Sequence, residues 1–396
     1  MKGPDQSPWD VFRIFLRLGL TSFGGPIAHI GYFRREFVLN RKWLDERAYA
    51  DLVGLCQFLP GPASSQVGFA LGLSRRGFST GLAAWLGFTL PSALVLFLFA
   101  SLAASFTGFT ATAAIHGLKI VAVAVVAQAL LGMAQSLTPD LRRIAIGVLA
   151  AIIVSFLAGS FGQILAIALG ALAGLLLCRG IATTAAAPLR VTTSRPLAIA
   201  SLILFALSLA VGPLFAGLNH TFAVFNAFYR SGALVFGGGH VVLPLLSDAV
   251  VRPGWLSPQS FLAGYGAAQA VPGPLFTISA YMGALLNTPP NGAWGAILAL
   301  IAIFLPGMLL VMAALPFWDG LRTRPSLQSA MRGINAAVVG ILAAALYSPL
   351  WTSAIADWRD AALAATGFAL LTFAKLPSWL IVLATVAGSI LLAAVP

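Results

Sequence analysis

The sequence contains two copies of one segment that is interrupted by helix-breaking residues, and this repeat constrains the fold more than any other feature. The first copy runs R-L-G-L-T-S-F-G-G-P over 17–26, followed by W-L at 43–44 and Q-F-L-P-G-P at 57–62. The second runs R-S-G-A-L-V-F-G-G-G over 230–239, followed by W-L at 255–256 and Q-A-V-P-G-P at 269–274. Helix-breaking residues therefore recur at matched places inside apolar segments. In membrane proteins, such matched interruptions point to a substrate site between two related halves.

The composition is that of a membrane protein. Of the 396 residues, 59% are hydrophobic and 9% are charged, whereas about 25% of residues are charged in soluble domains. We therefore expect a polytopic protein in contact with the lipid bilayer. The net charge of +12 does not indicate nucleic acid, because the basic residues occupy short loops between apolar segments. Cys56 and Cys178 lack metal-ligand spacing, and neither a metal nor another cofactor is expected.

Apolar segments follow one another along the whole chain. They lie near 10–38, 48–74, 77–105, 110–136, 143–158, 161–178, 197–217, 222–250, 260–287, 293–317, 330–350, 360–374 and 377–395. Four of them are interrupted, at 24–26, 60–62, 237–239 and 272–274. An arm of about 13 residues extends about 20 Å as a helix, so we predict re-entrant hairpins with tips near the membrane midplane. Ordinary spanning helices with kinks are the alternative.

The predicted fold is an all-α polytopic membrane protein with two inverted-topology repeats. Each repeat has two re-entrant helical hairpins followed by transmembrane helices. The predicted boundaries are an N-terminal repeat over 1–178, a cytoplasmic linker over 179–196, an inter-repeat transmembrane helix over 197–221 and a C-terminal inverted repeat over 222–396.

The distribution of basic residues supports this arrangement. Suppose that the N-terminus is cytoplasmic, that each broken segment returns to the side from which it entered, and that the other nine segments cross the membrane. Then 19 basic residues face the cytoplasm and 4 face outside. This satisfies the positive-inside bias. The loop at 34–47 has five basic residues and its counterpart at 248–256 has one, as inverted halves require. The C-terminus is then periplasmic.

The interrupted segments have the chemistry of an anion site. A helix N-terminus presents free N–H groups and attracts anions, and proline favours the first helical position. The incoming arm also places carbonyl groups at the tip, and those favour cations. The substrate-binding candidates are Arg17, Gly24, Gly25, Pro26, His29, Gln57, Pro60, Gly61, Pro62, Ser64, Ser65, Gln66, Arg230, Gly237, Gly238, Gly239, His240, Gln269, Pro272, Gly273, Pro274 and Thr277.

Ionisable side chains favour an anion over a cation. Arg17 and Arg230 each precede a glycine pair by seven residues, while the eleven acidic residues lie in or near loops. Ionisable groups at membrane depth are usually functional. Snorkelling, or an ion pair with Asp10, Asp51 or Asp248, is the alternative for the arginines. For His29 and His240 the alternatives are ligand contact, a proton relay or a structural role.

The repeated motifs resemble the signature of the chromate ion transporter family. In the first half these motifs are F-G-G-P-I-A-H-I-G-Y-F-R-R-E-F-V at 23–38, R-K-W-L-D-E at 41–46 and Y-A-D-L-V-G-L-C-Q-F-L-P-G-P-A-S-S-Q-V at 49–67. In the second, V-F-G-G-G-H-V-V-L-P-L-L at 235–246 and Q-A-V-P-G-P at 269–274 are similar to that family's C-terminal domain. The chain thus resembles the long, two-domain form. The resemblance implies a bacterial inner-membrane protein that exports chromate from the cytoplasm and confers chromate resistance.

We therefore expect a secondary active transporter and not an enzyme. Exporting a dianion from a cell that is negative inside gains about 4.6 kcal/mol per 100 mV, and proton antiport could add to this. The alternative is uptake or exchange of sulfate or a related oxyanion, because sulfate has the same shape and charge. The expected partners are chromate or a sulfate-like oxyanion and the lipid bilayer, with a homodimer as the candidate assembly.

Overall fold

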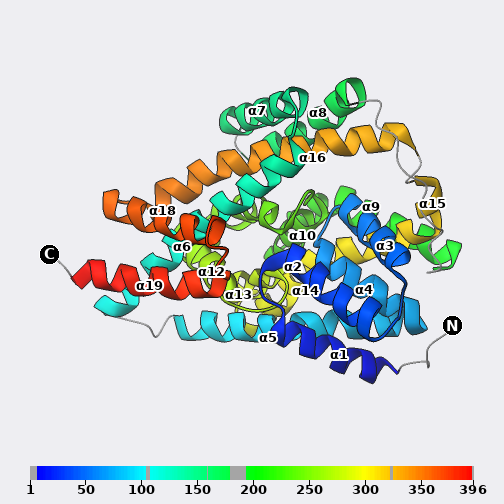
Figure 1. The fold of residues 1–396 in the computed structure, drawn as a ribbon, viewed down its shortest axis with the longest axis horizontal. Helices are drawn as coiled ribbons and strands as arrows, with labels where there is room; N and C mark the ends of the chain where they lie inside the picture. Colours follow the sequence, from blue (N-terminus) through cyan, green and yellow to red (C-terminus); the bar gives the residue numbers. More distant parts are fainter. Residues whose placement is uncertain (1–6, 104–107, 158, 179–192, 322–323, 395–396) are drawn as a thin grey trace.

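The computed structural model describes residues 7–103, 108–157, 159–178, 193–321 and 324–394. Within them every regular element is a helix (Figure 1). The first half contains α1 (Pro8–Thr21), α2 (Gly25–Phe33), the π-helical η1 (Arg34–Asn40), α3 (Glu46–Phe58), α4 (Ala63–Arg76), α5 (Phe78–Ala103), α6 (Phe109–Leu137), α7 (Leu141–Phe156) and α8 (Ser160–Leu177).

The second half repeats this order after one additional helix, α9 (Arg195–Ala216). Most of the predicted linker over 179–196 lies outside the described residues. The repeated elements are α10 (His220–Ala233), η2 (Gly239–Val241), α11 (Val242–Leu246), the π-helical η3 (Ser247–Val251), α12 (Pro258–Ala268), η4 (Leu275–Thr277), α13 (Ile278–Ala284), α14 (Gly292–Ala314), η5 (Leu315–Phe317), α15 (Trp318–Leu321), α16 (Pro325–Ala345), the π-helical η6 (Leu346–Trp351), α17 (Thr352–Ala354), α18 (Trp358–Thr372) and α19 (Ser378–Ala394).

Among the described residues, five helices are long and apolar enough to cross a membrane, which confirms the polytopic class. They cover Phe78–Leu102, Phe109–Leu137, Arg195–Ala216, Gly292–Phe317 and Pro325–Ala354. The other helices expected to cross are shorter: α7 has 16 residues, which is about 24 Å against a hydrocarbon core of about 30 Å. Crossing by α7, α8, α18 and α19 stays a prediction.

Each broken segment folds back on itself, as a hairpin does. In the first, the Phe15 ring lies 5.7 Å from that of Phe33 and 5.0 Å from that of Phe37. A straight helix would separate Phe15 from Phe33 by about 27 Å. The chain therefore reverses at the glycine break between α1 and α2. A kinked spanning helix does not account for these ring contacts.

The other three broken segments show equivalent contacts between their arms. The Arg75 guanidinium at the end of α4 lies 4.6 Å from the ring centre of Trp43, which precedes α3. The Ser231 hydroxyl lies 3.4 Å from the Leu245 carbonyl oxygen. The Tyr281 hydroxyl donates to the Ser260 carbonyl at 3.1 Å. All four segments are thus helical hairpins, and their re-entrant placement in a bilayer stays a prediction.

The two halves pack crosswise. Helices α7 and α8 of the first half pack against α16 of the second, and α18 and α19 of the second half pack against α6 of the first. Glycines permit close approach at matched positions: Gly117 of α6 meets Val386 of α19, and Gly333 of α16 meets Gly170 of α8. Both glycines and both partners are 216 residues apart. In each case a long helix of one half packs against the last helix of the other half; that the halves are inverted repeats stays a prediction.

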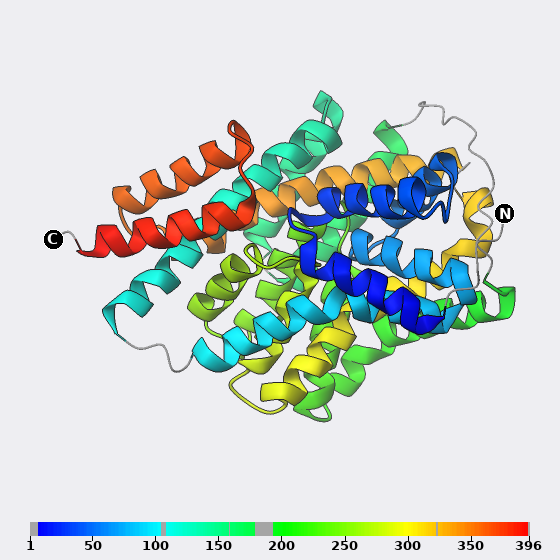
Figure 2. The ribbon, with the colours of Figure 1, turned by 60° about the horizontal axis from the view of Figure 1, so that its bottom comes forward.

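The equivalent helices α6 and α16 run in opposite directions in both views (Figures 1 and 2). The beginning of α1 and the end of α19 lie at opposite ends of the molecule. An inverted repeat requires this antiparallel course. The orientation of each half relative to the two faces of a membrane stays a prediction.

Candidate functional site

Two main-chain hydrogen bonds connect the four breaks in reciprocal pairs. The Gly61 N–H donates to the Val235 carbonyl at 2.7 Å, and the Gly273 N–H donates to the Ser22 carbonyl at 2.9 Å. The donors are 212 residues apart and the acceptors 213, which are the offsets of the sequence repeat. Each bond therefore joins the second hairpin of one half to the first hairpin of the other.

Further contacts bring the two pairs to one place. The His29 side chain, after the first break, lies 3.4 Å from the Ser64 hydroxyl, after the second. A Cβ at Gly239, after the third break, would lie 3.2 Å from Pro26 and 3.8 Å from Leu275, which follows the fourth. The four breaks thus meet at a single junction between the halves. We call this the break junction.

Glycine is required at the centre of the second and fourth breaks. Gly61 has φ +124° and Gly273 has φ +105°, a region that side chains disfavour. A Cβ at Gly61 would approach Gly307 of α14 at 3.2 Å, and one at Gly273 would approach the Ser92 side chain of α5 at 2.8 Å. The spanning helices α5 and α14 therefore support the break junction at equivalent positions.

His29 is held beneath the break junction in a defined tautomer. Its Nε2 lies 3.2 Å from the Ser22 carbonyl oxygen, which can only accept, so Nε2 carries the proton. Nδ1 of the neutral ring then accepts from the Ser64 hydroxyl. The side chain is 1% exposed, and its ring lies edge-on to Phe88 at 5.2 Å. Both ring nitrogens therefore connect parts of the first half.

Several buried polar atoms at the junction have no hydrogen-bond partner among the described residues. These atoms are the hydroxyls of Ser22 and Ser65 and Oε1 of Gln66. Nε2 of Gln66 is engaged, because it donates to the Pro60 carbonyl at 2.9 Å and to the Gly307 carbonyl at 3.2 Å. An unsatisfied buried polar group costs about 1–3 kcal/mol. The serine hydroxyls are thus available as donors to a ligand.

The second half has a less polar version of the same site. Phe276 and Ile278 occupy the positions equivalent to Ser64 and Gln66. Thr277 matches Ser65, but its hydroxyl donates to the Pro274 carbonyl at 2.6 Å. His240 lies with Nδ1 2.6 Å from the Tyr265 hydroxyl. The polar side chains of the junction therefore come mainly from the first half.

The remaining predicted residues lie at different distances from this centre. Gly24, Gly25 and Pro26 begin α2, and Pro62 precedes α4; Gly237, Gly238 and Pro272 lie within the breaks of the second half. Arg17 is exposed on α1 and Gln57 is exposed on α3. Arg230 is half-buried and lines a separate cavity of about 290 Å³ with Asp248 and Trp255. Gln269 is half-buried, and its carbonyl accepts from Ser378 of α19.

Four residues at or next to the break junction are not among the candidates predicted from the sequence. Ser22 supplies a carbonyl to two contacts, Tyr265 contacts His240, and Ser92 and Gly307 support the glycine turns. Both supports follow a Leu-Pro dipeptide, at 90–91 in α5 and 305–306 in α14. This second repeat, with an offset of 215, was the signal that could have identified them.

The arrangement suits an anion better than a cation. The contacts described above involve main-chain groups, hydroxyls, amides and imidazoles, and no carboxylate. Helix α4 has 14 residues and begins at the junction, so the first N–H groups of that helix lack intrahelical acceptors. Its partial positive charge favours a negative ligand. Elsewhere among the described residues, no group of His, Cys, Asp and Glu side chains could hold a metal ion.

Comparison with known proteins gives a family for this chain. The family model described as "Chromate transporter" matches residues 9–175 and, separately, residues 222–390. The chain belongs to the chromate transporter family. The two matched regions contain the two halves of the break junction, so this chromate transporter has the long form. Membership assigns it a transport role in a membrane.

Curated relatives agree with this family. A chromate transport protein of Pseudomonas aeruginosa is 27% identical over 86% of this chain and 80% of its own length. One of Cupriavidus metallidurans is 28% identical over 93% and 89%. The uncharacterized transporter YwrA of Bacillus subtilis is 31% identical, with 96% of its length covering 43% of this chain. No solved structure matches this chromate transporter.

Proposed function

We propose that this protein exports chromate across the bacterial cytoplasmic membrane by secondary active transport. The break junction carries the proposal, because it combines unsatisfied buried hydroxyls and a helix N-terminus at the contact between two equivalent halves. Chromate is a tetrahedral dianion whose oxygens accept hydrogen bonds from such donors. The chromate transport proteins of Pseudomonas aeruginosa and Cupriavidus metallidurans support this substrate.

The charge of the substrate supports the export direction. The interior of a bacterial cell is electrically negative relative to the outside. Moving two negative charges outward through 100 mV releases about 4.6 kcal/mol. The membrane potential alone therefore favours export, and inward movement of protons would add to it.

The reciprocal hydrogen bonds suggest how the site alternates. The bond from Gly61 to Val235 and the bond from Gly273 to Ser22 hold equivalent pairs of hairpins. In alternating access, one pair separates to open the site to one side of the membrane, and the other pair then separates to open it to the opposite side. Loosening one pair while the other remains closed prevents leakage.

Uptake of labelled chromate into inside-out vesicles tests the proposal. We expect uptake that depends on the potential and that excess sulfate reduces, because sulfate has the same shape and charge. Chromate accumulation confined to right-side-out vesicles would establish an importer instead. Uptake that neither depends on the potential nor saturates would exclude secondary active transport by this chain.

A pair of serine variants tests the site itself. Ser65 lies in the first turn of α4 with its hydroxyl unsatisfied, whereas the Ser74 hydroxyl near the end of the same helix donates to the Leu71 carbonyl. Loss of one hydrogen bond to a charged substrate costs about 1.5–3 kcal/mol, which lowers affinity about 10- to 150-fold. We expect Ser65→Ala to raise the chromate concentration needed for half-maximal transport by that factor, and Ser74→Ala to leave it unchanged. Equal effects of the two substitutions would remove Ser65 from the site.

A further inference from the structure

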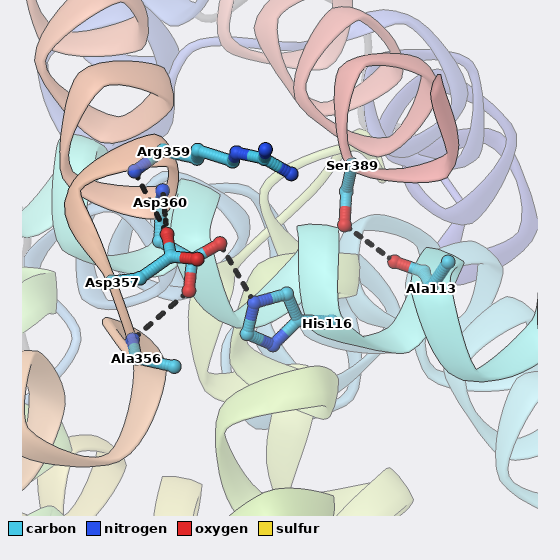
Figure 3. A network of polar contacts seen from close by, with 7 residues as sticks. All are labelled: Ala113, His116, Ala356, Asp357, Arg359, Asp360 and Ser389. Atoms are coloured by element: carbon cyan, nitrogen blue, oxygen red, sulfur yellow. Dashed lines mark hydrogen bonds and ion pairs between the residues drawn. The ribbon is translucent and has the colours of Figure 1, made fainter. Parts of the chain in front are cut away.

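A second polar cluster joins the halves away from the break junction. His116 of α6 lies with Nε2 2.9 Å from Oδ1 of Asp360 on α18. Figure 3 shows the imidazole directed at this carboxylate, with Arg359 above the two aspartates and Ser389 to the right, where its hydroxyl donates to the Ala113 carbonyl. His116 belongs to the first half and Asp360 to the second. A change in the relative position of α6 and α18 therefore changes this contact.

The carboxylate is held in place independently of the histidine. Its second oxygen accepts from the Ala356 N–H at 2.9 Å. The neighbouring Asp357 caps α18 by accepting from the Arg359 and Asp360 N–H groups at 2.8 Å and 3.1 Å. The side chains of His116 and Asp360 are 30% and 12% exposed. The pair is thus ordered, and it remains accessible from a cavity of about 640 Å³ that both residues line.

The charged groups of this cavity balance one another when His116 is neutral. Lys119 of α6 and Arg359 of α18 contribute two positive charges, while Asp357 and Asp360 contribute two negative charges. The other packed helices contribute uncharged side chains to the cavity, Gln259 from α12 and Ser389 from α19. Protonation of His116 therefore changes the cluster from neutral to a charge of +1.

The equivalent position at the other end of the molecule has no histidine–carboxylate contact. Gly117 and Gly333 set the offset at 216, so Arg332 corresponds to His116 and Ile144 corresponds to Asp360. Arg332 donates to the Cys178 carbonyl at 3.0 Å. The histidine–carboxylate contact is thus present at one of the two related ends, where α6 begins and α19 finishes.

We propose that His116 and Asp360 form the proton-binding site that couples chromate export to the proton gradient. This inference rests on the proposed export function. An imidazolium pairs with a carboxylate more strongly than a neutral imidazole does. By linkage, a movement of α6 relative to α18 that separates the pair also releases the proton. In the predicted orientation the cavity faces outside, where protons are more abundant.

The two histidines of the break junction are less suited to this role. Both ring nitrogens of His29 are bonded, one to a carbonyl and one to a hydroxyl. His240 contacts the Tyr265 hydroxyl. Protonating His29 at Nδ1 would remove the acceptor for Ser64 and would place a charge where no carboxylate partner is described. His116 has such a partner.

The test uses the full chain in proteoliposomes with the potential clamped at zero. Chromate export and internal pH are measured together, with and without a pH gradient of about one unit. If one proton is exchanged for each chromate, this gradient changes the chromate accumulation ratio about tenfold. We expect this stimulation in the wild type. We expect His116→Gln and Asp360→Asn to abolish it while retaining export driven by an imposed potential, which also shows that the variants fold.

His220→Gln is the matched control, because His220 contacts the Thr288 hydroxyl rather than an acid; it should retain the full stimulation. If His116→Gln and Asp360→Asn respond to the pH gradient like the wild type, the pair is not the coupling site. Wild-type export that ignores the gradient would refute the inference and leave the export function intact. No chromate flux in the wild type under either driving force would refute both.

Discussion

Gly19→Ala should weaken the break junction from a distance, because it acts through the contact between α1 and α5. A Cβ at Gly19 would lie 2.7 Å from the Phe88 carbonyl oxygen and 2.9 Å from that of Gly87. These are main-chain atoms of a spanning helix, which cannot move aside as the end of a side chain can. The first arm of the first hairpin must therefore shift away from α5.

The required displacement of α1 can be compared with the length of the hydrogen bond between Gly273 and Ser22. Ordinary van der Waals contact begins at 3.4 Å, so α1 must move by about 0.7 Å. Ser22 follows α1 directly, and its carbonyl accepts from Gly273 at 2.9 Å. A shift of that size along the bond would lengthen it to about 3.6 Å, beyond hydrogen-bond distance. Overpacking of this kind costs about 1–3 kcal/mol.

Thermal denaturation in detergent and chromate transport measure the two consequences. We expect Gly19→Ala to lower both the melting temperature and the transport rate. Gly232→Ala, the equivalent change in the second half, should do the same, because its Cβ would clash with the Ile303 carbonyl. Gly132→Ala is the control: this helical glycine is exposed with no atom within 4 Å of an added Cβ, and alanine there adds about 0.5–1 kcal/mol of stability. Wild-type melting and transport in Gly19→Ala would refute the reasoning.

Three further predictions concern single side chains. Gln66→Leu removes the donor for two buried carbonyls, so we expect a lower melting temperature from a loss of about 1–3 kcal/mol. Arg230→Ala should slow chromate transport more than Arg17→Ala does, because Arg230 lines a cavity and Arg17 is exposed; equal rates would contradict this. Hydrogen bonds from the Arg143 main chain and side chain lower the pKa of Asp140, so Asp140→Ala should reduce the melting temperature at neutral pH, and the difference should vanish as the pH falls through that pKa.

The positions of the breaks could be predicted from the sequence because helix breaking is local. Proline removes a backbone donor and glycine tolerates left-handed conformations wherever they occur. The structure confirms the interruptions next to Gly24, Gly61, Gly237 and Gly273. The apolar composition likewise predicted an all-α polytopic membrane protein, and five spanning helices confirm it.

The pairing of the breaks could not be predicted in the same way. In a membrane, apolar helix faces resemble one another and the lipid, so partner choice depends on small residues and shape. The crosswise packing of α18 and α19 on α6 depends on such contacts, for example at Gly117. His116 and Asp360 are 244 residues apart in the chain. Nothing in the sequence around either residue indicates that the two are partners.

The halves share a backbone arrangement but differ in side-chain chemistry, and this combination suits the proposed transport mechanism. The equivalent main-chain hydrogen bonds at Gly61 and Gly273 allow either pair of hairpins to close the site with a similar change in free energy. Ser64 and Gln66 of the first half correspond to Phe276 and Ile278 in the second. Ligand oxygens would therefore bond mainly to the first half, while the second half closes over them with an apolar surface. Substrate release then requires movement of the second-half hairpins and costs few hydrogen bonds on that side.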